Sequence, residues 1–150
     1  MTEKFFLDDD IPVICLAATS FPQGVLKAHT ELRTTLPFAA SRKFYGISWG
    51  DNKGGIIYKA AASELHDGEA ESLGYESFTI RKGEYLSEVL QDWSKEERRV
   101  EKTFKKLLAD PHIDKHGYCL EMYLNDKDMR CLVKLDTSIP EFRTLPLVTY

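Results

Sequence analysis

The sequence has no surplus of basic residues. Its 20 Lys and Arg side chains are outnumbered by 24 Asp and Glu side chains, which gives a formal net charge of -4. Proteins that bind nucleic acid usually carry a basic patch that neutralises phosphates, and neither such a patch nor a helix-turn-helix pattern stands out here. We therefore expect no direct binding of nucleic acid.

Long apolar runs are also missing, because no stretch approaches the roughly 20 apolar residues that a membrane-spanning helix needs. The N-terminus lacks the cationic start and apolar stretch of a secretory signal and contains Asp8-Asp9-Asp10 instead. Both absences predict a cytoplasmic protein without a membrane partner.

Cysteine is scarce, and its three occurrences make an odd number. Cys15, Cys119 and Cys131 lie within apolar segments and lack the spacing of zinc ligands. His112 and His116 are four residues apart, but no third ligand lies near them in the sequence. We therefore expect buried, reduced thiols, and neither a metal nor a cofactor.

The usual signatures of a nucleophile or a phosphate site are absent too. Ser20, Ser41 and Ser48 stand in no recognisable nucleophile motif. The glycine pair Gly54-Gly55 falls in an expected hairpin turn, so it does not begin a phosphate-binding helix.

What the chain does have is enough apolar sequence for one core, since 150 residues at 43% hydrophobic are typical of a single globular domain. Residues 12–18 form a continuous apolar run, which indicates a buried strand. A helix capped by Ser20 is expected to follow and to end before Pro37. Residues 43–49 and 56–64 then predict a hairpin.

The same order of elements begins again in the second half. Residues 75–90 read as strand-like, with a glycine kink. Ser94 and Glu97 have the spacing of a capping box at the start of a long helix. Residues 118–124 and 129–135 predict a second hairpin.

This order predicts one α+β domain over residues 1–150, built from duplicated strand-helix-strand-strand units whose antiparallel sheets surround a central groove. Repeat one covers about 12–64 and repeat two about 75–136. The apolar extension 137–150 is expected to cover a sheet edge or the groove, or to contribute to a homodimer. The groove between the halves is the default ligand site.

The strand expected at 118–124 carries one carboxylate among aromatic and apolar residues. Because side chains alternate along a strand, Cys119, Glu121 and Tyr123 share one face. A buried, unpaired charge is costly, so Glu121 either reaches water in a cleft, pairs with a cation or is protonated. The alternative is a solvent-facing Glu on a half-exposed strand.

Four short segments occur in a characteristic order. They are Phe44-Tyr45-Gly46-Ile47, Ile57-Tyr58-Lys59-Ala60-Ala61, Phe78-Thr79-Ile80-Arg81-Lys82-Gly83-Glu84-Tyr85 and Leu120-Glu121-Met122-Tyr123. Together the order and spacing resemble the gyrase-inhibitor-like (GyrI-like) small-molecule-binding domain in a stand-alone form. That domain is also the effector-binding part of some AraC-type and MerR-type regulators, which links it to transcription regulation and multidrug binding.

The resemblance implies that Glu121 points into a central aromatic groove. Aromatic faces and a buried acid together recognise a lipophilic cation. Tyr123 shares the face of Glu121, and Tyr85, Trp49 and Tyr58 are the other expected ligand-binding residues. Core packing is the alternative interpretation for Trp49, Tyr58 and Tyr85.

Two functions follow from these residues. In the first, which we favour, the protein is a non-enzymatic module that senses or sequesters a lipophilic, cationic small molecule, with any regulatory output supplied by a protein partner. In the second, it is a hydrolase that detoxifies a reactive, cyclopropane-containing small molecule, with Glu121 as the catalytic residue. Direct inhibition of gyrase would need a protein-facing surface that the sequence does not reveal.

Overall fold

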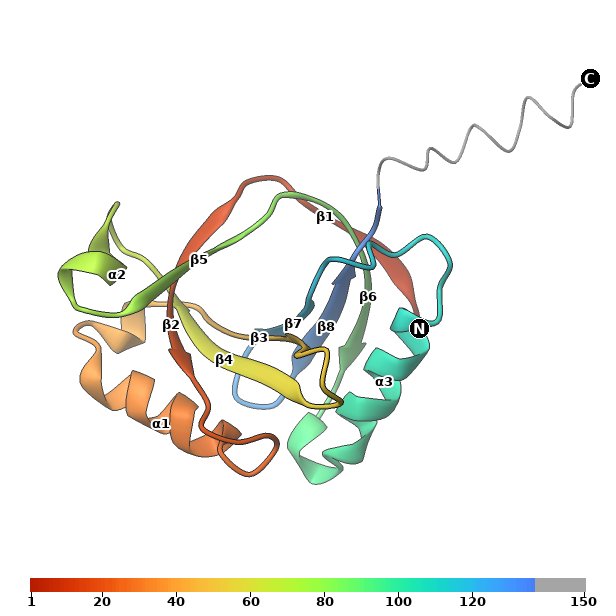
Figure 1. The fold of residues 1–150 in the computed structure, drawn as a ribbon, viewed down its shortest axis with the longest axis horizontal. Coiled ribbons are helices and arrows are strands. Elements are labelled where there is room, and N and C mark those ends of the chain that lie inside the picture. The colour runs from red at the N-terminus through yellow and green to blue at the C-terminus, as the bar shows by residue number, and fades with distance from the viewer. Residues whose placement is uncertain (137–150) are drawn as a thin grey trace, which may run out of the picture.

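The computed structural model describes residues 1–136 and shows a curled antiparallel sheet flanked by helices (Figure 1). The strands are β1 (Glu3–Leu7), β2 (Ile11–Ala17), β3 (Phe44–Gly50), β4 (Ile56–Ser63), β5 (Glu76–Ile80), β6 (Gly83–Leu90), β7 (Cys119–Tyr123) and β8 (Met129–Lys134). The helices are α1 (Val25–Thr35), α2 (Glu69–Ser72) and α3 (Arg98–Leu108), with 3₁₀ turns η1 (Ala39–Ser41) and η2 (Trp93–Lys95). The expectations for 137–150 lie outside the described residues. No helix in the described part is long and apolar enough to cross a bilayer.

The order of strands shows the expected duplication. Along the sheet the strands run β1-β6-β8-β7-β3-β4-β2-β5. This order reads the same from either end once β1 to β4 are exchanged for β5 to β8. The strands β3 and β7 therefore meet at the centre, while β1 and β5 form the edges, each beside a strand of the other unit. The α+β class and the duplicated units are confirmed.

One strand boundary differs from the sequence prediction. The pattern of 75–90 indicates a single kinked strand, but β5 and β6 pair at opposite ends of the sheet. Gly83 at the break has a φ of 129°, a backbone conformation that favours glycine. The sequence did not suggest the N-terminal strand β1. Like β5 and β6, the consecutive strands β1 and β2 lie towards opposite ends of the sheet (Figure 1).

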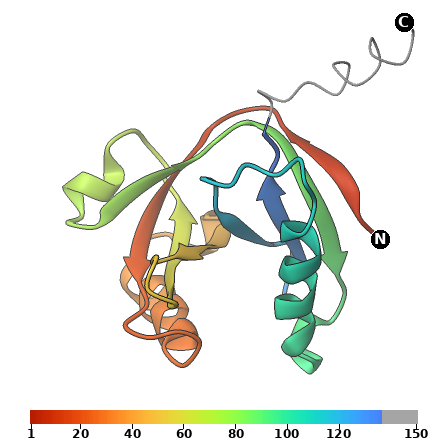
Figure 2. The same cartoon turned by 45° about the vertical axis from the view of Figure 1, so that its right-hand side comes forward.

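The helices α1 and α3 lie on one face of the sheet and well apart from each other (Figures 1 and 2). Helix α1 packs on β2 and β4 through Ala28 and Leu32. Helix α3 packs on β6 and β8 through Phe104 and Leu107. The central strands β3 and β7 consequently lie between the two helices, where side chains can form a site rather than a core.

The expected helix caps are wrong. Helix α1 begins after Gly24, whose N–H donates to the carbonyl of Ser20 at 3.1 Å, so Ser20 closes a separate turn. Ser94 lies within η2, and Glu97 precedes α3 without a capping hydrogen bond from its side chain. A short turn comes before each helix, and local capping patterns do not reveal such turns.

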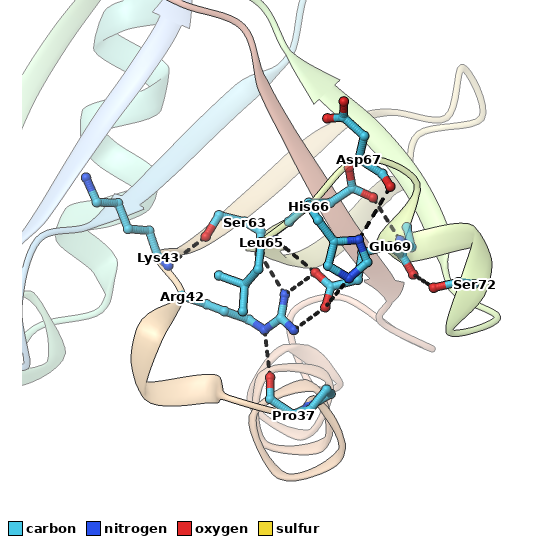
Figure 3. A network of polar contacts seen from close by, with 11 residues as sticks. Pro37, Arg42, Lys43, Ser63, Leu65, His66, Asp67, Glu69 and Ser72 are labelled. Atoms are coloured by element: carbon cyan, nitrogen blue, oxygen red, sulfur yellow. Dashed lines mark hydrogen bonds and ion pairs between the residues drawn. The ribbon is translucent and has the colours of Figure 1, made fainter.

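A buried ion pair links Glu69 of α2 to Arg42, which directly follows η1 (Figure 3). The guanidinium nitrogens Nη1 and Nη2 of Arg42 donate to the two carboxylate oxygens of Glu69, each at 2.6 Å. Arg42 also donates to the carbonyls of Pro37 and Ser63 at 3.0 Å, and Glu69 Oε1 accepts from the Leu65 N–H at 2.9 Å. Arg42 stabilises the carboxylate and lowers the pKa of Glu69 to about 2.

Candidate ligand-binding site

Glu121 occupies the middle of the sheet, in β7 and directly opposite Gly46 of β3. Its neighbours Leu120 and Met122 pack into the core on the helix-free face. Tyr123 instead contacts the cores beneath both helices. The alternation predicted for this strand is therefore confirmed, and Glu121 points to the face that carries α1 and α3.

Two tyrosine hydroxyls hold one oxygen of the Glu121 carboxylate. Oε1 accepts hydrogen bonds from Tyr58 at 2.7 Å and from Tyr123 at 2.6 Å. Within residues 1–136, neither a hydrogen bond to Oε2 nor a salt bridge to Glu121 is seen. The carboxylate is thus oriented by its neighbours but is not neutralised by a side chain of the described residues.

The surroundings raise the pKa of the Glu121 carboxyl. Burial is the main cause, and the hydrogen bonds from Tyr123 and Tyr58 oppose it only in part. Burial and the nearby carboxylate also raise the pKa of both tyrosines well above the ordinary value, so their hydroxyls remain protonated donors. The site therefore holds a carboxyl that gains from any cation brought to it.

His29 of α1 extends this hydrogen-bonded group. Its Nε2 lies 2.7 Å from the Tyr58 hydroxyl, which already donates to Glu121. Burial, assisted by Arg33, lowers the pKa of His29 to about 4. Neutral His29 consequently acts as the donor to Tyr58, with its proton on Nε2. The chain His29, Tyr58, Glu121 fixes the direction of each hydrogen bond.

Aromatic rings from both halves of the protein pack against the two tyrosines that hold the carboxylate. Phe21 stacks on Tyr58, with ring centroids 5.9 Å apart. Trp93 lies against Tyr123 at 5.8 Å, and His29 meets Tyr123 edge-on at 5.3 Å. The ring of Tyr58 is buried, while Phe21 is 41% exposed. We call the set the Glu121 cluster; its members are Phe21, His29, Tyr58, Trp93, Glu121 and Tyr123.

Gly46 makes room for this arrangement. A Cβ atom built on Gly46 would lie 2.1 Å from the Tyr58 hydroxyl oxygen and 2.4 Å from Oε1 of Glu121. Real Cβ atoms do not approach other heavy atoms so closely, so a side chain here would displace one group or the other. Gly46 therefore sets the contact between Tyr58 and Glu121.

The structure brings together three of the five residues that the sequence suggested. Glu121, Tyr58 and Tyr123 meet in the Glu121 cluster. Trp49 and Tyr85 lie on the opposite, helix-free face. Tyr85 is fully buried and donates to the Arg81 carbonyl at 2.5 Å, while Trp49 stacks on an aromatic of β5.

The sequence reasoning missed the binding potential of Phe21, His29 and Trp93. Phe21 and Trp93 stand in the turns just before α1 and α3, which are equivalent places in the two repeats. Aligning the repeats on their helices would have indicated both aromatics.

No arrangement for a metal ion is present among residues 1–136, where no group of three His, Cys, Asp or Glu side chains could hold one. His112 is exposed, and its Nδ1 lies 3.2 Å from Asp110 Oδ1 within its own loop. The histidine pair His112 and His116 therefore offers no assembled ligand set.

No protein-family model and no curated protein sequence matches this chain. Solved structures do share its fold. An integron cassette protein from the mobile metagenome of Vibrio cholerae is 12% identical, with a TM-score of 0.65 over 89% of this chain and 95% of that chain. The protein SAV2435, solved bound to tetraphenylphosphonium, is 10% identical, with a TM-score of 0.60 over 95% and 98% of the two chains.

A protein from Listeria innocua described as a hydrolase is also similar. It is 10% identical to this chain, with a TM-score of 0.52 over 89% of this chain and 90% of its own length. At such low identities these likenesses show a common fold and nothing about activity.

Proposed function

We propose that this protein binds a lipophilic organic cation at the Glu121 cluster and serves as a stand-alone sensor or sequestering module. The observation that carries the proposal is the Glu121 carboxylate itself. Two tyrosines orient its Oε1, further aromatic rings pack against those tyrosines, and none of the described residues supplies a counter-ion. A ligand with positive charge and aromatic surface would satisfy all of these groups.

The energetics favour such a ligand over a neutral one. A unit charge about 5 Å from a carboxylate gains about 3 kcal/mol at an effective dielectric constant of about 20. Each aromatic face that meets the cation adds about 0.5–2 kcal/mol. Burial raises the pKa of the Glu121 carboxyl because a buried charge without a partner is costly. A cationic ligand lowers this cost, so its binding also favours the ionised form of the carboxyl.

The fold comparison supports this choice of ligand class. SAV2435, solved bound to tetraphenylphosphonium, shares the fold over 95% of this chain. Tetraphenylphosphonium is a permanent cation enclosed by aromatic rings, which is the chemistry that the Glu121 cluster would recognise. We also propose that the chain is a GyrI-like effector-binding domain, and the shared fold supports this proposal.

The cysteines support a cytoplasmic location as part of the proposal. Cys15, Cys119 and Cys131 form no disulfide. Burial raises the pKa of Cys15 to about 12 and that of Cys119 to about 11, so both remain unreactive thiols. We further propose that any regulatory output of ligand binding comes from a protein partner or from a homodimer.

Glu121→Gln is expected to weaken the binding of tetraphenylphosphonium roughly 50-fold, because the loss of the charge removes about 2–3 kcal/mol of attraction. Gln still offers a carbonyl oxygen to Tyr58 and Tyr123, so the fold should persist. Isothermal titration calorimetry measures the dissociation constant. The matched control is Glu101→Gln, an exposed acid on α3 that should bind like the wild type. Equal affinity of Glu121→Gln and wild type would refute the proposal.

The affinity for tetraphenylphosphonium should fall as the solution is acidified. Glu121 has a pKa raised above the ordinary 4.5, so acidification protonates it and removes its charge at a higher pH than for an ordinary carboxyl. His29, with a pKa of about 4, then gains a proton and adds a repelling positive charge. Both changes act in the same direction. Calorimetry in buffers of different ionisation enthalpy should also show release of a proton on binding, and an affinity that is independent of pH would contradict this prediction.

A second candidate function is hydrolysis of a reactive small molecule at the same carboxyl. It is favoured by the raised pKa of Glu121, which suits a general acid, and by the shared fold with a protein described as a hydrolase. Incubation with a cyclopropane-containing electrophile, followed by mass spectrometry, separates the two functions. A binding module returns the compound unchanged, whereas a hydrolase adds one water to it and loses this ability in Glu121→Gln.

A further inference from the structure

A pocket of about 550 Å³ lies away from the Glu121 cluster. Its aromatic lining consists of Trp49, Phe78 and Tyr118, which pack against the core on the helix-free face of the sheet. The Glu121 cluster lies on the other face, since Glu121 and its strand neighbours alternate. The two sites are therefore separated by the sheet itself.

The aromatic rings of this pocket are arranged for a flat ligand. Trp49 and Phe78 lie nearly parallel, with an interplanar angle of 16° and centroids 6.3 Å apart. Tyr118 meets Phe78 edge-on at 5.2 Å, and its hydroxyl is held by Tyr85 at 2.8 Å and by the Arg81 N–H at 2.9 Å. Trp49 and Phe78 are only partly buried, so their surfaces remain accessible in the pocket.

The polar groups of the lining favour an anion. Lys115 and His116 both line the pocket, and their side chains are exposed. Among the described residues, no salt bridge or hydrogen bond to either side chain is seen. The lining contains no Asp or Glu.

Two acids that are close in sequence to the lining residues, Asp51 and Asp114, accept hydrogen bonds from backbone N–H groups. Asp51 Oδ1 accepts from the Lys53 and Gly55 N–H groups at 2.7 and 2.9 Å. Asp114 Oδ1 accepts from the His116 N–H at 2.9 Å. Each carboxylate therefore helps to close its own turn, and among the residues that line the pocket the charged group is the ammonium of Lys115.

We propose that this pocket is a second ligand site, selective for a planar aromatic carboxylate. The ring system stacks on Trp49 and Phe78, and the carboxylate meets Lys115, with His116 as a hydrogen-bond donor. The protein then carries two sites of opposite charge preference on the two faces of one sheet. This inference does not depend on what the Glu121 cluster binds.

The two tryptophans allow both sites to be observed separately, since Trp49 lines this pocket and Trp93 belongs to the Glu121 cluster. In a ¹H–¹⁵N spectrum each indole N–H gives one signal, assigned with Trp49→Phe and Trp93→Phe. Titration with 2-naphthoate should shift the Trp49 signal saturably and leave the Trp93 signal in place. Addition of 2-naphthylmethylammonium, the cation of the same size, should not shift the Trp49 signal.

The charge preference is tested by Lys115→Gln, which should weaken binding of 2-naphthoate about fivefold, as expected for a partly exposed ion pair. Lys127→Gln, in the exposed turn between β7 and β8, is the matched control and should bind like the wild type. The proposal is overturned if the Trp49 signal does not respond, if it responds equally to the cation or to neutral 2-naphthylmethanol, or if Lys115→Gln binds as tightly as Lys127→Gln.

Discussion

Arg42→Met is expected to lower the free energy of unfolding by about 3–5 kcal/mol, because it leaves the buried carboxylate of Glu69 without its partner. The side chain of Arg42 is fully buried and that of Glu69 is 6% exposed, so water cannot replace the lost hydrogen bonds. The carbonyls of Pro37 and Ser63 lose a donor as well. Equilibrium unfolding in urea measures the change. A domain of this size has a total stability of about 5–15 kcal/mol, so the variant should be close to unfolding.

The dependence on pH distinguishes an unpaired charge from simple loss of packing. In the wild type, the pKa of Glu69 is about 2 and lies below the ordinary 4.5, so the pair stabilises the fold above about pH 4.5 and loses this effect as the pH falls towards 2. In Arg42→Met, the buried carboxyl is instead destabilising when ionised. The difference between the two proteins should therefore shrink on acidification.

A double variant provides the control. Arg42→Met combined with Glu69→Leu removes both charges and should regain about half of the lost stability, since apolar groups can replace a buried ion pair. The recovery is incomplete because the two carbonyls still lack a donor. The explanation would be wrong if the double variant were as unstable as Arg42→Met and if the stability difference between wild type and Arg42→Met did not change with pH. The charge of Glu69 would then not be the cause of the lost stability.

Several features of the fold follow from local patterns in the sequence. The side-chain alternation that places Glu121 and Tyr123 on one face is a property of any strand, so it can be predicted without knowledge of the neighbours. The hairpins β3–β4 and β7–β8 are marked by polar turns between apolar runs, which are also local signals. The duplication follows from the repeated order of these elements.

The residues of neighbouring strands that face the candidate site could not be predicted in the same way, because they depend on the register between strands that are distant in sequence. Gly46 pairs with Glu121, so a residue of β3 shares the face of Glu121 only if it is an even number of positions from Gly46. Trp49 is three positions away and therefore faces the other side. Register is fixed by long-range packing, and the pattern of a single strand does not contain it.

The buried pair Arg42 and Glu69 shows a second limit. Glu69 stands in the polar stretch 65–74, whose composition indicates a solvated connection, and Arg42 stands in the short connection before β3. Charged residues are seldom buried, so neither position predicts burial. They become buried because η1 and α2 fold over the same end of the sheet (Figure 3). Such an approach of two connections is a property of the assembled fold.

Gly46→Ala is expected to abolish ligand binding at the Glu121 cluster and to lower the free energy of unfolding by about 1–3 kcal/mol, the usual cost of an overpacked position. The added methyl group would lie 2.1 Å from the Tyr58 hydroxyl oxygen and 2.4 Å from Glu121 Oε1. One side chain must then rotate, which breaks the hydrogen bond between them and, with it, the contact to His29. Calorimetric titration with tetraphenylphosphonium and unfolding in urea measure the two effects.

Gly50→Ala is a closely matched control, because Gly50 ends the same strand and a Cβ there meets no atom within 4 Å. It should bind and unfold like the wild type. Adding Tyr58→Phe to Gly46→Ala removes the hydroxyl that makes the shortest contact, so part of the stability should return while ligand binding stays weak. Recovery of stability without recovery of binding would show that Gly46 is needed for the orientation of the Glu121 carboxylate. If Gly46→Ala instead behaved like Gly50→Ala, the close contact between β3 and Tyr58 would have no such role.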